Sequence, residues 1–247
     1  MTANEFTVYA AQSLEPAFKR LLPLFEAANG TAVKTVYGHT GALRLEIEGH
    51  MPCDAFCGAD RANAEALERS GAAQGLFPFA RNRLVVVTRD ERRFWNEDWS
   101  TILCDPSIAI GTSTPITSPE GDWTGKLFQN IAKAFPKMLG SKIIAQHSVA
   151  LIGGTRTDED PEKETGAAFI LRHGVDAAVV YGSWAAKIEA EGLKIHEIAP
   201  EVQPEILYHA CFPRKGEAPA PLKKVFREFL LSDPAQTILK EVGFLAP

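Results

Sequence analysis

Hydrophobic residues along the chain alternate between short runs typical of strands and longer runs with helical spacing, separated by glycine, proline or polar residues. Residues 6–11 predict a strand. Residues 13–28 predict a helix that buries Leu14, Phe18 and Phe25 on one face and bends at Pro23. Similar strand and helix patterns follow at residues 32–37, 40–48, 54–57 and 61–69. Three strand–helix steps in a row favour a parallel sheet.

A second series of elements occupies the rest of the chain. Residues 84–88 predict a further strand, which a polar segment with Trp95 and Trp99 follows. Strands are then predicted at residues 107–111, 142–146, 176–181, 193–198 and 206–212, and helices at 123–139, 165–172, 184–191 and, with an interruption near Asp233, at 221–242. Residues 153–161 are acidic and contain glycine, which indicates a flexible loop. The sequence therefore predicts two α/β lobes.

Composition and charge narrow the classes of partner. The chain has 247 residues, of which 45% are hydrophobic and 23% charged, as in an ordinary globular protein. Its net charge is −5 and its basic residues form no long run, so no nucleic-acid partner is expected. No apolar stretch approaches the ~18 residues that span a bilayer, and residues 1–6 lack the features of a signal peptide. A small ligand is the expected partner.

Motifs of enzyme chemistry are missing from the sequence. Gly-x-Ser-x-Gly, His-Glu-x-x-His, Cys-x-x-Cys and Gly-x-Gly-x-x-Gly do not occur, so an enzyme is not expected. Cys53, Cys57, Cys104 and Cys211 are expected to be ordinary thiols, and no metal site is predicted. Among the six histidines, His39 lies in a strand-to-helix turn, where binding groups concentrate, and is a candidate ligand contact.

Two hydroxyl residues, Ser13 and Thr40, stand where a predicted strand gives way to a helix. Each could serve as a helix N-cap, worth ~1 kcal/mol, or as a donor to a ligand. Amides, hydroxyls and positive helix ends converge at the carboxyl edge of a parallel sheet. Such an edge can hold an anion without any full positive charge.

Several segments, in this order, carry a resemblance to a known family. They are residues 6–14 (FTVYAAQSL), 37–43 (YGHTGAL), 52–60 (PCDAFCGAD), 82–87 (NRLVVV), 179–183 (VVYGS), 233–236 (DPAQ) and 243–244 (GF). With them the chain resembles the periplasmic molybdate-binding proteins of ABC importers. The resemblance implies the two-lobed periplasmic-binding-protein type II fold, in which each lobe is a mainly parallel sheet flanked by helices.

The resemblance also implies the residues of an oxyanion site. Ser13 matches a serine of the first loop, and Thr40 stands where the family usually has a serine. Ala59 matches a backbone contact beside the third strand, and Tyr181 matches a tyrosine whose hydroxyl reaches the anion from the second lobe. The ligand implied is molybdate or tungstate, with no other cofactor.

This chain departs from the family pattern mainly in the second lobe. Glu120 brings a carboxylate next to the expected anion, which is unfavourable unless it points outward or is protonated. The family's next backbone contact falls on Lys163 and Glu164, directly after the acidic loop, and His39 beside Thr40 is also unusual. Alternative ligands are therefore another oxyanion, or a cation or metal chelate drawn by Glu120, Asp122 and His39.

The expected organisation places residues 1–82 and 206–247 in lobe 1 and residues 83–205 in lobe 2, with hinge crossings at residues 82–88 and 205–214. Ligand is expected in the cleft between the lobes. The resemblance implies a monomeric periplasmic protein that delivers its ligand to a membrane permease. A transferase or a ligand-sensing domain on the same fold is the alternative from another class.

Overall fold

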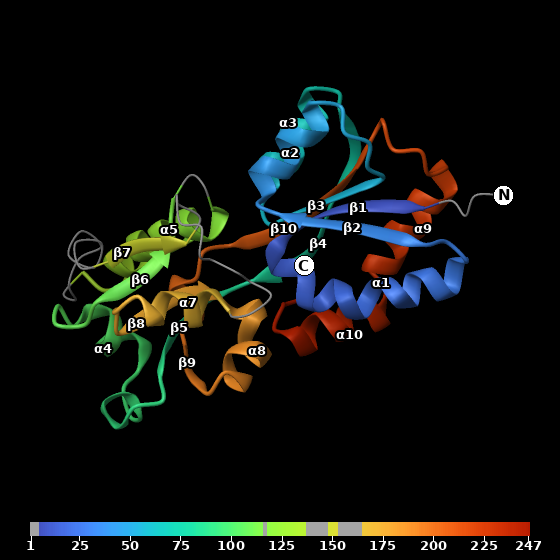
Figure 1. Ribbon diagram of the computed structural model, residues 1–247. Helices are drawn as coiled ribbons and strands as arrows, with labels where there is room; N and C mark the ends of the chain where they lie inside the picture. Colours follow the sequence, from blue (N-terminus) through green and yellow to red (C-terminus); the bar gives the residue numbers. More distant parts are fainter. Residues whose placement is uncertain (1–4, 116–117, 137–147, 153–164) are drawn as a thin grey trace. The chain divides into compact units, whose positions relative to one another are not determined.

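The chain folds into two compact units, seen in the computed structural model of Figure 1, which describes residues 5–115, 118–136, 148–152 and 165–247. Unit 1 consists of Met1–Asn82 and Ile206–Pro247, and unit 2 of Arg83–Glu205. The chain thus leaves unit 1 after Asn82 and re-enters it at Ile206. Unit 2 is an insertion in the sequence of unit 1.

Unit 1 is a sheet covered by helices on both faces. Its strands are β1 (Phe6–Ala11), β2 (Val33–Gly38), β3 (Ala55–Gly58), β4 (Ala73–Asn82) and β10 (Ile206–Pro213), and its helices are α1 (Glu15–Asn29), α2 (Thr40–Glu48), α3 (Arg61–Arg69), α9 (Ala220–Leu230) and α10 (Asp233–Val242). The strand order is β2-β1-β3-β10-β4. β1 pairs in parallel with β2 and β3, and β10 pairs antiparallel with β3 and β4.

The two faces of the unit 1 sheet bury different side chains. Helices α1, α9 and α10 cover one face, where Phe6, Phe25 and Phe226 pack with ring centroids 4.9–5.6 Å apart. Helices α2 and α3 cover the other face, where Leu43 and Leu67 join a buried cluster. These two layers hold the sheet, and with it the strand ends, in place.

Unit 2 repeats this plan. Its strands are β5 (Leu84–Arg89), β6 (Ile110–Ser113), β7 (Ser148–Ile152), β8 (Ala177–Tyr181) and β9 (Leu193–Glu197), and its helices are α4 (Trp99–Cys104), α5 (Pro119–Ala134), α7 (Gly166–Arg172) and α8 (Ala185–Ala190). The strand order is β7-β6-β8-β5-β9. β6 pairs in parallel with β7 and β8, while β5 pairs antiparallel with β8 and β9.

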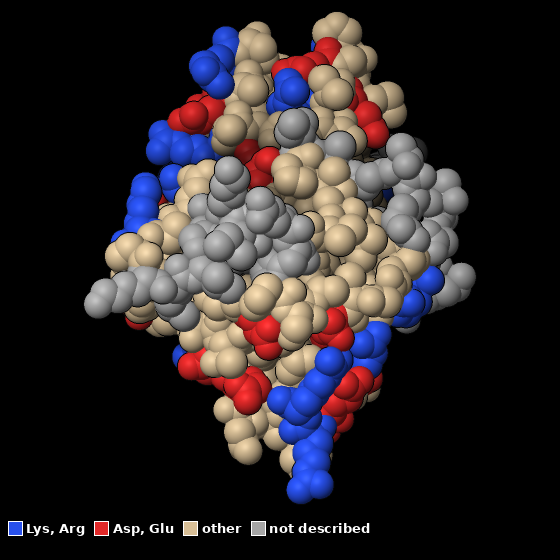
Figure 2. Space-filling view, turned by 90° about the vertical axis from the view of Figure 1, so that its left-hand side faces the viewer, with Lys and Arg blue, Asp and Glu red and all other residues tan. Residues whose placement is uncertain are grey.

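Figure 2 shows Lys and Arg as well as Asp and Glu side chains, gathered mainly toward the margins of the face in view. Several charged side chains of the protein form ion pairs, such as Arg61 with Glu65 at 2.5 Å and Arg93 with Glu91 at 2.9 Å. Exposed pairs of this kind stabilise the fold little. Among the helices built from the described residues, none combines the length and the apolar character that a bilayer crossing requires.

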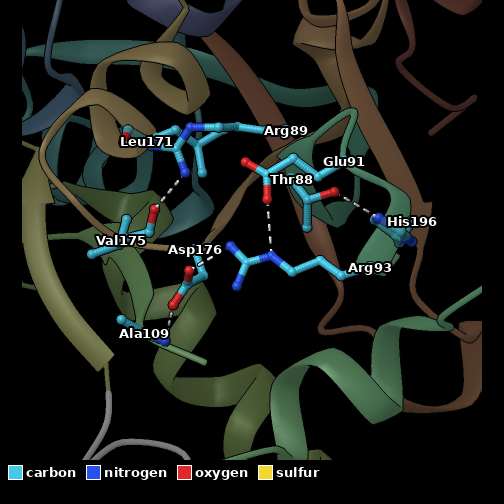
Figure 3. A network of polar contacts seen from close by, with 9 residues as sticks. All are labelled: Thr88, Arg89, Glu91, Arg93, Ala109, Leu171, Val175, Asp176 and His196. Carbon is cyan, nitrogen blue, oxygen red and sulfur yellow. Dashed lines mark hydrogen bonds and ion pairs between the residues drawn. The ribbon is translucent and has the colours of Figure 1, made fainter. Parts of the chain in front are cut away.

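A network of polar contacts lies at the end of the unit 2 sheet where β6 and β8 begin (Figure 3). The carboxylate of Asp176 accepts hydrogen bonds from the Ala109 N–H at 2.9 Å and from the Arg93 guanidinium at 2.6 Å. Arg89 donates to the carbonyl oxygens of Val175, at 3.1 Å, and Leu171. The network ties the segment after β5 to the turn between α7 and β8.

The predicted α/β class with two helix-flanked sheets is confirmed. The parallel arrangement holds for three strands of each sheet, whereas the other two strands join antiparallel, so that each sheet is mixed. Burial raises the pKa of the Cys53, Cys57 and Cys211 thiols. None of the four cysteines, all of which lie among the described residues, takes part in a disulfide bond.

Some predicted boundaries were wrong. β6 begins at Ile110, because Ser107 is held by its amide and hydroxyl in a turn on the Asp105 carboxylate. α5 begins at Pro119 rather than Trp123, since proline fits the first turn of a helix. Strand β4 and helix α4 were not predicted at all. The predicted strand at 142–146 and the loop at 153–161 lie outside the described residues.

Candidate functional site

Three predicted site residues lie at one edge of the unit 1 sheet. β1, β2 and β3 run in parallel, so their carboxyl ends share an edge, which we call the carboxyl edge of unit 1. Ser13 lies in the 3-10 turn that follows β1, Thr40 is the first residue of α2 after β2, and Ala59 follows β3. His39, exposed, is the residue that precedes α2. The sheet thus brings loops far apart in the sequence together.

Thr40 is buried at this edge and is held from behind by a backbone amide. Its hydroxyl oxygen accepts a hydrogen bond from the Ala59 N–H at 3.2 Å, and the residue is 1% exposed. A Cβ atom at Gly58 would lie 2.9 Å from Cγ2 of Thr40, so the glycine permits this close approach. Because an N–H group can only donate, the hydroxyl hydrogen of Thr40 is left to donate elsewhere.

Ser13 belongs to a buried chain of three polar side chains. Its hydroxyl lies 2.8 Å from the Tyr208 hydroxyl, which also accepts a hydrogen bond from the Asn82 side-chain amide at 3.1 Å. Sequence reasoning missed Tyr208 and Asn82 as neighbours of Ser13, because they come from β10 and β4. The polar residue Asn82, at the end of β4 and shortly before the hydrophobic strand β5, was the available signal.

The interpretation of Ser13 and Thr40 as N-cap residues was wrong. α1 is preceded by Leu14, and α2 by His39, which makes no side-chain capping bond. Neither hydroxyl is therefore spent on a helix end. The first N–H groups of α2 have no side-chain cap, and the positive end of that helix dipole lies at the carboxyl edge.

The predicted site residues of unit 2 lie at the corresponding edge of its own sheet. Tyr181 is the last residue of β8 and is 4% exposed. Glu120 lies in the first turn of α5 and accepts a hydrogen bond from the hydroxyl of Ser113, the last residue of β6, at 3.2 Å. Glu120 is buried, so it does not point outward into solvent. Lys163 lies outside the described residues.

The helix α5 starts in close contact with the preceding loop. A Cβ atom at Gly121 would lie 2.5–2.6 Å from the backbone atoms of residues 113–115. Glycine is therefore required at this position, and it fixes Glu120 beside Ser113. Glu120, a departure from the family pattern, therefore belongs to a defined helix start at Ser118–Gly121.

Arg83 is a cation near this edge of unit 2 that the sequence reasoning did not single out. It precedes Leu84, which pairs with Tyr181, and its carbonyl accepts from the Gly182 N–H at 2.8 Å. Its guanidinium donates to both carboxylate oxygens of Glu197 at 2.9 and 2.7 Å, and this hydrogen bonding raises the pKa of Arg83. Glu197 thus offsets the charge of Arg83.

The structure also contains a cavity in unit 1 that is distinct from the predicted site. A cavity of about 420 Å³ in unit 1 is lined by Thr7, Lys34, Cys53, Asp54 and their neighbours, near the amino ends of β1 and β2. No predicted site residue lines it. No group of three or more His, Cys, Asp or Glu side chains able to hold a metal ion occurs in the described part of the chain.

Comparisons with known proteins agree on the family. The family described as bacterial extracellular solute-binding protein matches residues 6–245. The molybdate-binding protein ModA of Mycobacterium tuberculosis is 27% identical over 122 residues, which are 45% of this chain and 47% of that protein. The chain matches less than two thirds of the length of the first curated relatives, 63% and 47%.

Solved structures share the fold over nearly the whole chain. The periplasmic molybdate-binding protein of Azotobacter vinelandii has a TM-score of 0.75 at 18% identity, covering 98% of this chain and 99% of its own. The sulfate-binding protein SubI of Mycobacterium tuberculosis has a TM-score of 0.77 at 18% identity, covering 98% and 86%. At this identity the likeness establishes the fold.

Proposed function

Because the chain belongs to the family of bacterial extracellular solute-binding proteins, we propose that it serves an ABC importer by capturing a tetrahedral oxyanion of the molybdate or tungstate type. The proposed ligand is supported by the similarity to molybdate-binding proteins and by the chemistry of the carboxyl edge of unit 1. In the proposed role, the protein binds and releases this ligand without changing it chemically.

The observation that carries this proposal is that the fold holds two buried hydroxyl groups, those of Ser13 and Thr40, in place. Thr40 accepts from a backbone amide, and Ser13 lies beside the Tyr208 hydroxyl, so both oxygens are held in place by the fold. Together with the uncapped start of α2, they offer donors and a positive helix end to an anion. A charged ligand strengthens each such hydrogen bond.

The residues proposed to complete the site are Tyr181 and the backbone of Lys163, with His39 and Glu120 as further candidates, while Ala59 contributes by donating its N–H to Thr40. Tyr181 keeps its hydroxyl at the end of a buried strand, and the Glu120 carboxylate accepts from Ser113. This hydrogen bond gives the carboxylate a partner within its own unit.

The proposed partner is a membrane permease, and the proposed location is the periplasm or the outer face of the cell membrane. Both proposals are supported by the description of the family as extracellular. In this role the protein acts as a monomer and needs no bound cofactor besides its ligand.

A thermal-shift panel tests the proposal. Molybdate, tungstate, sulfate, phosphate and divalent metal ions are added separately at constant ionic strength. An oxyanion at ~100 times its dissociation constant is expected to add about 2.7 kcal/mol to the free energy of unfolding. Stabilisation by sulfate alone would change the ligand within the same function. Stabilisation by a metal ion and by no oxyanion would contradict the proposal.

A further inference from the structure

The cavity of unit 1 lies away from the carboxyl edge, at the other end of the same strands. Its floor is the start of β1 and β2, where Thr7 pairs with Lys34 and Tyr9 pairs with Val36. We call it the amino-edge cavity. Thr7 is the second residue of β1 and Ala11 is the last, so ~13 Å of strand separates the floor of this cavity from the carboxyl edge.

The four floor residues face the same side of the unit 1 sheet. Alternate residues of a strand point to one face, and residues that pair across neighbouring strands share a face. Tyr9 and Val36 pack in the cluster beneath α2 and α3. Thr7 and Lys34 extend the same face toward the amino ends of the strands. There the chain that follows α2, at residues 51–54, forms one wall of the cavity.

The buried carboxylate of Asp54 joins the floor of the cavity to its other wall, at residues 216–218. Asp54 is 3% exposed, and its carboxylate accepts hydrogen bonds from the Thr7 N–H at 2.9 Å and the Ala218 N–H at 2.7 Å. A Cβ atom at Gly216 would lie 2.3 Å from the Cys53 carbonyl oxygen, so glycine permits the two walls to meet. The cavity is therefore a fixed part of the folded unit.

Charges of both signs line this cavity. Lys34 brings an ammonium group next to Thr7 on the neighbouring strand, while Glu5 and Glu217 bring carboxylates. Within the part of the chain that the structure describes, none of these three charged side chains has an ion-pair partner. The ammonium group and the carboxylates thus share one cavity without pairing with each other, so both signs of charge are available to a ligand.

The remaining lining and the size of the cavity suit a small organic molecule. Val36, Met51 and Pro52 add apolar surface among the charged groups. The volume, about 420 Å³, falls in the range of ~300–1,000 Å³ that is typical of small-molecule sites. Apolar surface among charges of opposite sign fits a short carbon chain with a charge at each end.

We propose that the amino-edge cavity binds a small zwitterion, such as an amino acid with a short carbon chain. Its carboxylate pairs with Lys34 and accepts from the Thr7 hydroxyl, and its ammonium group pairs with Glu5 or Glu217. An anion or a cation of the same size would gain one of these attractions and meet repulsion from the other group. This site is separate from the oxyanion site and does not depend on the function proposed above.

Calorimetry with γ-aminobutyrate tests the ligand class, against butyrate and butylamine at the same pH and ionic strength. The three molecules share a carbon chain and differ in which charges they carry. We expect γ-aminobutyrate to bind with a dissociation constant below about 1 mM and at least about tenfold more tightly than either single ion. No binding of γ-aminobutyrate, or equal binding of butyrate or butylamine, would overturn the proposal.

Two variants test the assignment of the charges. Lys34→Met keeps the length of the side chain, and should weaken γ-aminobutyrate at least about fivefold without weakening butylamine. Glu5→Gln combined with Glu217→Gln should weaken γ-aminobutyrate by a similar factor without weakening butyrate. All three residues are exposed, so both variants should fold. Parent affinity for γ-aminobutyrate in either variant would overturn the assignment.

Lys240→Met is the matched control. Lys240 is also an exposed lysine of unit 1, but it lies in α10, on the opposite face of the sheet. Its variant should bind γ-aminobutyrate like the parent. An equal loss in Lys240→Met and Lys34→Met would show a general effect of net charge and would overturn the site.

Titration of the same variants with molybdate separates this inference from the proposed function. Because ~13 Å of strand lies between the two sites, molybdate affinity should stay within about twofold of the parent value. A parent that binds γ-aminobutyrate and no oxyanion would overturn the proposed function alone. A parent that binds molybdate and no γ-aminobutyrate would overturn the amino-edge site alone.

Discussion

At the scale of single residues, the position of a hydroxyl relative to a strand end decides its role. Thr40 lies one residue too far along the chain to cap α2, and its oxygen instead receives the Ala59 N–H. The hydroxyl hydrogen of Thr40 therefore remains available to donate to a ligand. An N-cap hydroxyl would also keep its hydrogen, but here the Ala59 N–H fixes the side on which the Thr40 oxygen accepts. The proposed function of the carboxyl edge of unit 1 depends on this position of Thr40, one residue after the N-cap.

Replacing Thr40 by valine tests this role. Thr40→Val keeps the shape and removes the donor, so we expect oxyanion affinity to fall roughly tenfold or more, measured by calorimetry. The fold should lose about 1–3 kcal/mol, because the Ala59 N–H is left without its acceptor. Thr40→Ser, which keeps the hydroxyl, is the control and should bind like the parent. Equal binding by both variants would show that Thr40 is structural.

The candidate site was predictable only as far as its loops are local. Ser13 and Thr40 follow strands that their own neighbours define, so the sequence places them at strand-to-helix turns. Tyr208 lies 195 positions from Ser13, and no local pattern indicates that β10 enters the sheet beside β3. Identifying Tyr208 as the hydrogen-bond partner of Ser13 therefore required the structure.

At the scale of elements, β9 is held to the segment before α4 by His196. The buried imidazole lies 3.0 Å from the Thr88 hydroxyl and 3.0 Å from the Glu97 carbonyl oxygen. Burial is the main cause that lowers the pKa of His196 below 6.5. The folded protein thus favours the neutral imidazole, and the unfolded chain binds the proton more readily.

The free energy of unfolding is therefore expected to fall as the pH decreases through about 6.5 toward the lower pKa of folded His196. Denaturant titrations across this range measure the slope. His196→Gln should reduce it, whereas His50→Asn, at an exposed position with φ of 76°, should leave it unchanged. An identical slope in parent and His196→Gln would contradict this assignment.

Helix α1 contains an internal proline, which is unfavourable in a helix. Pro23 lies inside Glu15–Asn29, where it removes one backbone hydrogen bond. Pro23→Ala is expected to raise the free energy of unfolding by about 1–3 kcal/mol, measured by chemical denaturation. Pro16→Ala, in the first turn of the same helix, should give no gain. Equal effects of the two substitutions would contradict the argument.

Elements were predictable where hydrophobic spacing and punctuation agree, and not elsewhere. β1 and α3 have the predicted bounds, because clear patterns end at polar or glycine residues. β4 escaped prediction because Gly75, with φ of 76°, and Pro78 interrupt its pattern, and its pairing with β10 is irregular nearby. α4 is short and depends on Asp98, whose carboxylate accepts from the Thr101 N–H at 2.8 Å.

At the scale of the whole molecule, charge opposes the proposed ligand. The net charge of −5 repels an anion at long range, and the proposed donors are neutral. Affinity should therefore change less than about threefold between roughly 0.05 and 0.5 M salt, without a steep fall. Calorimetry over this range decides. A steep loss would indicate that a charged side chain contacts the ligand, such as that of Lys163, of which the proposed site uses only the backbone.

The insertion of unit 2 into unit 1 has a consequence for synthesis on the ribosome. β10 lies between β3 and β4, yet its residues, Ile206–Pro213, emerge only after the whole of unit 2. Unit 2 is continuous in sequence, so it can close its sheet while residues 1–82 still await their inner strand. At this stage of synthesis, the nascent chain has a folded unit 2 and a unit 1 that is still unfolded. Tyr208, the hydrogen-bond partner of Ser13, arrives with β10, so the proposed ligand site can be completed only after unit 2 has been synthesised.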